Sequence, residues 1–200
     1  MKKTFFISFI MFSMSLIINA QTSDDIKTAK DLTFFGVDYT NCYFVHSQAF
    51  YDLDDVKAKI IAWNNLFKSE YDKYLAKNFS KRKITFSDEM IRRINEQIDP
   101  ATRVSDDESL YNHLNPEQIP LIIDNYKFSS ELTGIGFILI AECYSKPEEK
   151  GSYYVVFFDI PTKKVLTVDR MTGKARGFGL RNYWANSYYV VLKDVGSKIK

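Results

Sequence analysis

The sequence predicts an α/β fold: a mixed, mostly apolar sheet of about four to five strands, with helices packed on its faces and a C-terminal β-hairpin followed by a helix. Two observations support this expectation. Strand-like runs that are apolar on both faces alternate along the chain with segments whose apolar residues recur every three or four positions. In the second half, two further strand-like runs are separated by a short turn at Pro161, which indicates an antiparallel hairpin.

The first predicted strand begins at Thr33 and is clearest over residues 40–46, where apolar side chains occur on both faces. A long helix is expected over 54–77, because apolar residues recur there at helical spacing. Those residues are Val56, Ile60, Trp63, Phe67, Tyr71 and Tyr74. Asp52 precedes this helix, where its carboxylate can accept hydrogen bonds from free backbone amides.

The middle of the chain predicts shorter elements. Residues 83–86 are expected to form a short strand, and Ser87 is expected to cap the helix that follows. Residues 101–113 have the composition of a loop. Asn115 followed by Pro116 predicts the start of another helix, because Asn caps a helix and Pro is tolerated in its first turn.

The second half predicts the most regular part of the fold. Residues 135–144 are nearly all apolar and predict a central strand, and residues 153–160 predict a second. After the turn, residues 164–170 are expected to return as the antiparallel partner of the second strand. A final helix is expected over 180–195, because apolar and small residues recur there every three or four positions.

Residues 1–20 have the three parts of a secretory signal peptide. Two lysines form the positive start, an apolar stretch follows, and Ala20 is the small residue before the expected cleavage site. The mature chain is then expected to have a flexible lead-in over 21–32 and a single α/β domain over 33–200. We therefore expect an exported protein, periplasmic or extracellular, with no transmembrane segment in its mature chain.

Charge and cysteine content narrow the function classes. Lys2 and Lys3 are two of the chain's 27 basic residues, so their removal leaves 25 against 25 acidic residues. A chain without net charge exerts no long-range attraction on nucleic acid, so we expect no nucleic-acid partner. Cys42 and Cys143 are a candidate disulfide in an oxidising compartment, and their apolar, strand-like surroundings also suit buried thiols.

The second half also resembles a known group of periplasmic domains. The run GFILIAECY, followed by SYYVVFFDIPTKKVLTVDRMTG and a helix, is similar to the anticodon-binding-like α/β domains of the Tol-system periplasmic protein and the curli-secretion lipoprotein group. Asp159 stands where the first hairpin strand of those domains ends in Asp. The ending GFGLRNYWANSYYVVLK resembles small exported Gram-negative envelope proteins of unknown function. The resemblance implies this fold and an envelope setting, and it implies no catalytic residue.

The sequence contains none of the common enzyme motifs. It has no nucleophile elbow, Walker loop, dinucleotide fingerprint or spaced His and Cys set for zinc, so no catalytic residue, metal or cofactor is predicted. The most site-like segment is GKARGFGLR, residues 173–181, where glycines can bring backbone amides near an anion and basic side chains add charge. The candidate ligand-binding residues are Lys174, Arg176, Gly177, Gly179 and Arg181. The alternative is a strand-to-helix loop whose basic side chains are solvated.

These observations favour a non-enzymatic binding or assembly module of the cell envelope that works by surface contact. Its expected partner is another envelope protein or a second copy of itself. Exposed tyrosines are a candidate contact surface, and the examples are Tyr153, Tyr183 and Tyr189. Two alternatives stay open: a binder of a small anion or glycan at residues 173–181, and a carboxylate-dependent hydrolase, for which two suitably placed acidic side chains suffice.

Overall fold

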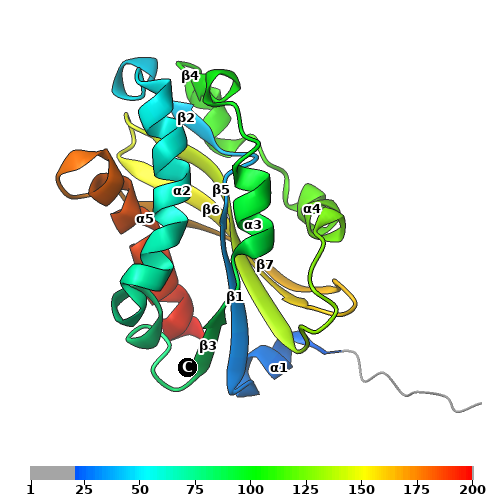
Figure 1. Ribbon diagram of the computed structural model, residues 1–200. Coiled ribbons are helices and arrows are strands. Elements are labelled where there is room, and N and C mark those ends of the chain that lie inside the picture. The colour runs from blue at the N-terminus through cyan, green and yellow to red at the C-terminus, as the bar shows by residue number, and fades with distance from the viewer. Residues whose placement is uncertain (1–20, 200) are drawn as a thin grey trace, which may run out of the picture.

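A computed structural model describes residues 21–199 of the chain (Figure 1). Its regular elements are, in chain order, α1 (Ser23–Thr28), β1 (Asp31–Asp38), β2 (Tyr43–Val45), α2 (Leu53–Ser69), β3 (Lys83–Phe86), α3 (Glu89–Asn95), β4 (Val104–Ser105), α4 (Ile119–Asn125), β5 (Ile135–Ser145), β6 (Lys150–Asp159), β7 (Val165–Lys174) and α5 (Gly179–Lys198). The predicted signal peptide, residues 1–20, lies outside the described residues. Within residues 21–199, no helix is both long and apolar enough to cross a membrane.

All seven strands form one sheet, in which β5 is central. On one side, β5 pairs in parallel with β1 and then with β2; on the other side it pairs antiparallel with β6. β3 and β4 lie outside β1 and β2, and β7 lies outside β6. The predicted α/β class, with a C-terminal hairpin and a final helix, is confirmed. The sheet has more strands than expected because the first predicted strand is divided, and because β4 lies in the segment expected to be a loop.

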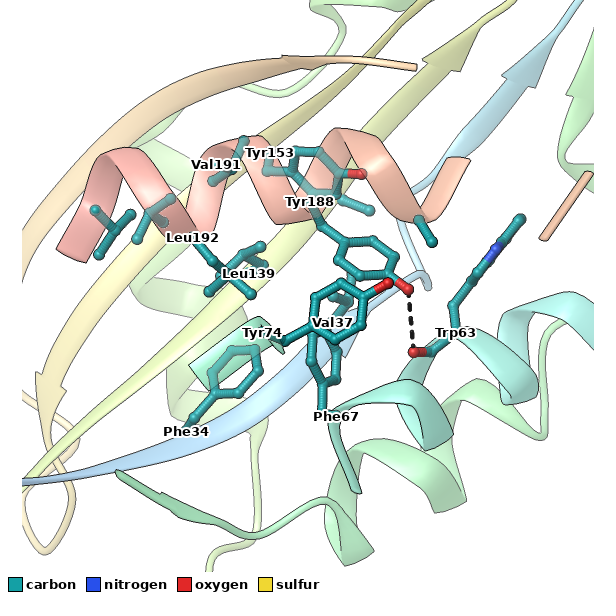
Figure 2. Close-up of a cluster of buried hydrophobic side chains, with 14 of the residues drawn as sticks. Phe34, Val37, Trp63, Phe67, Tyr74, Leu139, Tyr153, Tyr188, Val191 and Leu192 are labelled. Carbon is teal, nitrogen blue, oxygen red and sulfur yellow. Dashed lines mark hydrogen bonds between the residues drawn. The ribbon is translucent and has the colours of Figure 1, made fainter. Parts of the chain in front are cut away.

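Helices cover the two faces of the sheet unequally (Figure 1). On one face, the long helices α2 and α5 pack around the larger core cluster. Figure 2 shows Tyr188 of α5 beside Phe67 of α2, with the Tyr188 hydroxyl donating to the Trp63 carbonyl (3.4 Å). The second cluster is covered by α3 and α4, of seven residues each, which contribute Ile91 and Ile123. Shorter helices cover less of the second face than α2 and α5 cover of the first.

The first predicted strand is interrupted. β1 ends at Asp38 and β2 begins at Tyr43, so the prediction of one strand that begins at Thr33 and includes residues 40–46 is wrong, and only Tyr43–Val45 of its clearest part is a strand. The Thr40 N–H donates to the Asp38 carboxylate (2.8 Å), a side-chain bond of the kind that favours a turn over an extended strand. His46, directly after β2, has a φ of 90° and therefore ends the extended backbone.

Side-chain amides complete the sheet where β1 has no neighbouring strand. β3 pairs only with the first half of β1, and β4 pairs only with β2, so residues 37–39 face an opening that we call the Val37 gap. Asn64 of α2 accepts from the Val37 N–H and donates to the Val37 carbonyl, both at 2.8 Å. Asn95 of α3 accepts from the Tyr39 N–H and donates to the same carbonyl, both at 2.9 Å. The two buried amides therefore replace a strand at this edge.

The close approach of Asn64 requires glycine at position 36. Gly36 has a φ of +95°, in the left-handed region that disfavours other residues. A Cβ added there would lie 2.4 Å from Asn64 Oδ1. Any side chain at this position would therefore strain the backbone and displace the amide from Val37.

The segment 21–32, expected to be a flexible lead-in, contains α1 and the start of β1. Ile26 of α1 is buried in the larger core cluster. The Arg82 guanidinium donates to the carbonyls of Ile26 and Lys27, both at 2.8 Å, and to that of Ile199. The polar composition of this segment conceals a helix because α1 buries a single side chain.

Two helix boundaries also differ from the predictions. The helix expected over 54–77 is α2 followed by a π-helical turn at Asp72–Ala76, because Glu70 leaves the helical backbone with φ −123° and ψ 40°. Ser87 does not cap α3; its N–H donates to the Phe34 carbonyl (2.9 Å) and continues the pairing of β3 with β1. The first difference is a change of backbone conformation at Glu70, and the second is a hydrogen bond to the neighbouring strand.

We expect Asn64→Ala to destabilise the protein by about 2–3 kcal/mol, because the Val37 N–H loses its partner in the interior. Asn65→Ala is the matched control, because Asn65 is the next residue of α2 and is exposed. Its effect should stay within about 0.5 kcal/mol. Urea unfolding followed by circular dichroism measures both changes, and equal midpoints for the two variants would contradict the role assigned to Asn64.

Candidate functional site

The turn after β1 places a carboxylate in the interior. Asp38 is 0% exposed, and it accepts hydrogen bonds from the Thr40 N–H (2.8 Å) and from the Tyr126 hydroxyl. Burial raises the pKa of the Asp38 carboxyl above its ordinary value, while the bonds from Tyr126 and Thr40 act in the opposite direction. The bond to Asp38 fixes Tyr126, and with it the chain that leaves α4.

A cavity of about 530 Å³ lies between α3 and the segment that links α4 to β5. We call it the α3–α4 cavity. Its floor is aromatic: Phe35 of β1 is 1% exposed, and its ring centroid lies 4.6 Å from that of Phe128. Tyr126, the partner of Asp38, is also part of the lining. The other apolar lining residues are Met90, Ile94 and Leu132.

Charged side chains surround the mouth of the α3–α4 cavity. Arg93 and Glu89, one turn apart on α3, form an ion pair (2.5 Å), and both side chains are 70% exposed. Lys127 is exposed and belongs to none of the ion pairs found within residues 21–199. The mouth therefore carries one positive charge more than negative charge. An aromatic floor with a cationic mouth suits a molecule with an apolar body and an anionic end.

A second buried carboxylate has a structural role. Glu142 of β5 is 0% exposed, and its two oxygens accept from Arg170 Nε (2.7 Å) and from the Leu114 N–H (3.1 Å). Arg170 also donates to the Tyr111 carbonyl (2.7 Å). These bonds attach the loop before α4 to β5 and β7. Both oxygens of Glu142 are engaged, so the group is placed to hold a loop rather than to meet a ligand.

The structure divides the predicted anion-binding segment, residues 173–181. Arg176 lines a polar cavity of about 200 Å³, which we call the Arg176 cavity. The other polar lining residues include Lys73, Asn182 and Asn186. Arg181 does not line this cavity, and its Nε donates to Asn182 Oδ1 (3.2 Å). Arg176 and Arg181 are close in the sequence, but they do not line the same cavity.

The other three predicted residues shape the turn between β7 and α5. Gly177 and Gly179 have φ values of +126° and +74°, which glycine adopts without steric cost. Lys174, at the end of β7, is exposed, and its carbonyl accepts from Asn186 Nδ2 (2.8 Å). Contact of these three residues with an anion stays a prediction.

Cys42 and Cys143 are buried and free in the structure. Cys42 belongs to the larger core cluster, as does Tyr144, the neighbour of Cys143 on β5. Side chains alternate along a strand, so Cys143 points toward the other face of the sheet. Burial raises the pKa of both thiols, that of Cys143 to about 12. Both are therefore held as thiols, and the candidate disulfide is not formed here.

The tyrosine prediction is wrong for Tyr153. This residue is 0% exposed, because β6 lies between β5 and β7 and its side chain enters the larger core cluster. Its hydroxyl donates to the Tyr144 hydroxyl (3.0 Å) and bonds to Ser187 Oγ (2.5 Å). Tyr183 is half-buried, and its hydroxyl accepts from Lys146 Nζ (3.0 Å). The expected tyrosine surface is thus largely used for packing.

Comparison with known proteins adds no family to these observations. No protein-family model, curated protein or solved structure matches the chain. The resemblance to anticodon-binding-like periplasmic domains therefore stays a prediction. In the part of the chain that the structure describes, no group of three or more His, Cys, Asp or Glu side chains is placed to hold a metal ion.

Sequence reasoning missed the α3–α4 cavity. Its lining comes from β1, from α3 and from residues 125–132, which are distant in the chain and meet only in the fold. The available signal was the run Tyr126–Phe128, in which a lysine lies between two aromatic residues after a short helix. Spacing alone does not distinguish such a run from ordinary core packing.

We expect the free energy of unfolding to decrease as the pH rises through the titration of Asp38. The folded state holds this proton to a higher pH than the unfolded chain does, because burial raises the pKa of the carboxyl. Asp38→Asn should remove the decrease that begins as the pH rises above the ordinary pKa of aspartate, whereas Asp72→Asn, at an exposed position, should preserve it. Urea unfolding at several pH values tests this, and parallel curves for wild type and Asp38→Asn would disprove it.

Proposed function

We propose that the protein is a non-enzymatic binding module of the cell envelope, and that its α3–α4 cavity holds a small amphipathic anion. The observation that carries this proposal is the divided lining of the cavity, with the Phe35–Phe128 pair at the floor and Lys127 at the mouth. Its volume of about 530 Å³ lies within the range of small-molecule sites. Export of the chain, and contact with another envelope protein or a second copy, belong to the same proposal.

The positions of the buried acids support a binding role over hydrolysis. Asp38 is bonded to Tyr126 and to the backbone of Thr40, and Glu142 is bonded to Arg170 and to the backbone of Leu114. At the cavity mouth, Glu89 is paired with Arg93. The two buried carboxylates thus hold parts of the fold together, and Glu89 is engaged in an exposed ion pair on α3. The carboxylate-dependent hydrolase gains no support from them.

The ligand class follows from the chemistry of the lining. Phe128 is partly exposed and offers aromatic surface to an apolar body, either a ring system or an acyl chain, while the buried Phe35 packs against it. Lys127 is a point charge on a flexible stem, so it can reach a carboxylate at the mouth. We therefore name aromatic and medium-chain carboxylates as the ligand class.

Isothermal titration calorimetry with 1-naphthoate and dodecanoate tests this assignment. We expect Lys127→Glu to weaken binding of both probes by about fivefold, because it replaces attraction by repulsion at the mouth. Phe128→Leu should weaken naphthoate more than dodecanoate, because only an aromatic ligand loses ring stacking.

Lys193→Glu is the matched control, since Lys193 is an exposed lysine of α5, on the other face of the sheet. It should bind both probes as wild type does. Failure of the wild-type protein to bind either probe, or equal affinities for Lys127→Glu and Lys193→Glu, would refute the proposed ligand class.

The Arg176 cavity supports a second candidate, a small inorganic anion. Arg176 and Lys73 supply positive charge there, and the side-chain amides of Asn182 and Asn186 can donate hydrogen bonds. Lys73 is also bonded to Glu70 (2.7 Å), so Arg176 is the more available cation. Of the five residues expected to bind an anion in the segment 173–181, this second candidate site uses only Arg176.

For this candidate, Arg176→Ala should weaken binding of inorganic phosphate by about tenfold or more, because a charge-assisted hydrogen bond is lost. Arg181→Ala, outside the Arg176 cavity, should bind phosphate as wild type does. Both variants should keep the wild-type melting temperature, because both side chains are exposed. Phosphate titration followed by NMR chemical shifts gives the affinities, and equal losses in the two variants would contradict a site at Arg176.

A further inference from the structure

The loop between β7 and α5 exposes an aromatic side chain at its tip. Phe178 is 94% exposed, the highest value among the four exposed large hydrophobic residues within residues 21–199. Figure 1 shows this orange segment extending from the body of the molecule at the start of α5. Exposure of one whole phenylalanine ring to water is unfavourable, so its position requires a physical reason.

The backbone holds Phe178 outward. Gly177 and Gly179, on either side of it, have positive φ values of +126° and +74°. The base of the loop is anchored: the Arg176 N–H donates to the Tyr183 carbonyl (3.0 Å), and Trp63 Nε1 donates to the Arg181 carbonyl (3.0 Å). The exposed ring therefore lies on a turn whose two ends are hydrogen-bonded to the rest of the protein.

The loop that carries Phe178 is rich in basic residues. Lys174, Arg176 and Arg181 are exposed, and none of them belongs to an ion pair within residues 21–199. An acidic residue, Glu149, lies at the base of the loop, where its backbone carbonyl accepts from the Ala175 N–H (2.8 Å). Glu149 is itself bonded to the Tyr183 hydroxyl (3.2 Å). Three exposed cations without an ion pair thus lie within four positions of the exposed ring along the chain.

We propose that residues 174–181 dock the protein on an anionic lipid surface. In this arrangement Phe178 enters the interfacial layer, and Lys174, Arg176 and Arg181 lie at the level of the lipid phosphates. A single exposed ring is small beside the roughly 800 Å² that each partner buries in a stable protein interface. One exposed ring is sufficient for peripheral membrane contact when nearby cations also attract the anionic headgroups. This inference concerns a surface separate from the α3–α4 cavity and does not depend on the ligand proposed there.

Vesicle co-sedimentation tests the proposal. The assay uses the purified protein after export, and mass spectrometry determines its N-terminus. We expect binding to vesicles that contain phosphatidylglycerol and little binding to vesicles of phosphatidylcholine alone. Salt at about 0.5 M should release the protein, because it screens the attraction between the cations and the headgroups. Equal binding to both kinds of vesicle would overturn the proposal.

Phe178→Ser should weaken vesicle binding by about tenfold or more, since the ring no longer leaves water. Replacing any one of Lys174, Arg176 and Arg181 by Gln should weaken it by about fivefold. Leu121→Ser is the matched control, because Leu121 is also exposed (65%) but lies on α4. It should bind as wild type does.

Two results separate the lipid surface from a free phosphate in the Arg176 cavity. If Arg176→Ala alone abolishes vesicle binding while Phe178→Ser and Arg181→Gln leave it unchanged, a headgroup in that cavity explains the data and the proposal fails. In a Phe178→Trp variant, we expect the added emission to shift to shorter wavelength with phosphatidylglycerol vesicles. An unshifted spectrum would also contradict insertion of residue 178.

Discussion

The hydrogen bonds from Asn64 and Asn95 to the β1 edge fix the geometry on which the rest of the molecule depends. They satisfy the backbone at the Val37 gap, so β1 can end there while β5 continues beside β2. The turn that follows buries Asp38, which binds the Tyr126 hydroxyl. Tyr126 in turn positions the segment that lines the α3–α4 cavity. Interactions at the edge of the sheet are thereby connected to the cavity between α3 and the segment that links α4 to β5.

The unequal covering of the sheet divides structural from functional roles. The long helices α2 and α5 cover the larger core cluster, and the aromatic rings there pack against each other. The seven-residue helices α3 and α4 do not cover the second face completely, and a cavity lies beside them. The turn into α5 holds the other exposed feature, the ring of Phe178. The α3–α4 cavity and the exposed ring of Phe178 therefore lie in separate parts of the molecule.

The fold could be predicted from the sequence to the extent that its elements are local. The apolar run 135–144 and the turn at Pro161 are complete signals within a few residues, and both correspond to the observed strands and hairpin. The Val37 gap is not local, because it depends on Asn64 and Asn95, which are polar residues in helical segments and read as solvated positions. Their partners are backbone atoms of a distant strand, and periodicity contains no information about such bonds.

The candidate sites also differ in whether their residues are adjacent in the sequence. Residues 173–181 were identifiable because glycines and basic residues are adjacent in the sequence, but their separation into the Arg176 cavity and an outward Phe178 depends on left-handed backbone at two glycines. The lining of the α3–α4 cavity comes from three distant segments, so no contiguous motif marks it. Sites formed within one loop could thus be located approximately, and the site formed between elements could not.

The positions of the two tryptophans have an optical consequence. Trp63 and Trp184 are the only tryptophans in the chain, and both are buried in the larger core cluster, each within 5.2 Å of the Tyr144 ring centroid. Light absorbed by the tyrosines around them can pass to the indoles, whose emission comes from an apolar environment. Intrinsic fluorescence therefore reports the integrity of the face covered by α2 and α5. No tryptophan lines the α3–α4 cavity, so a ligand that does not absorb there, such as dodecanoate, would leave the emission spectrum of a correctly folded protein unchanged.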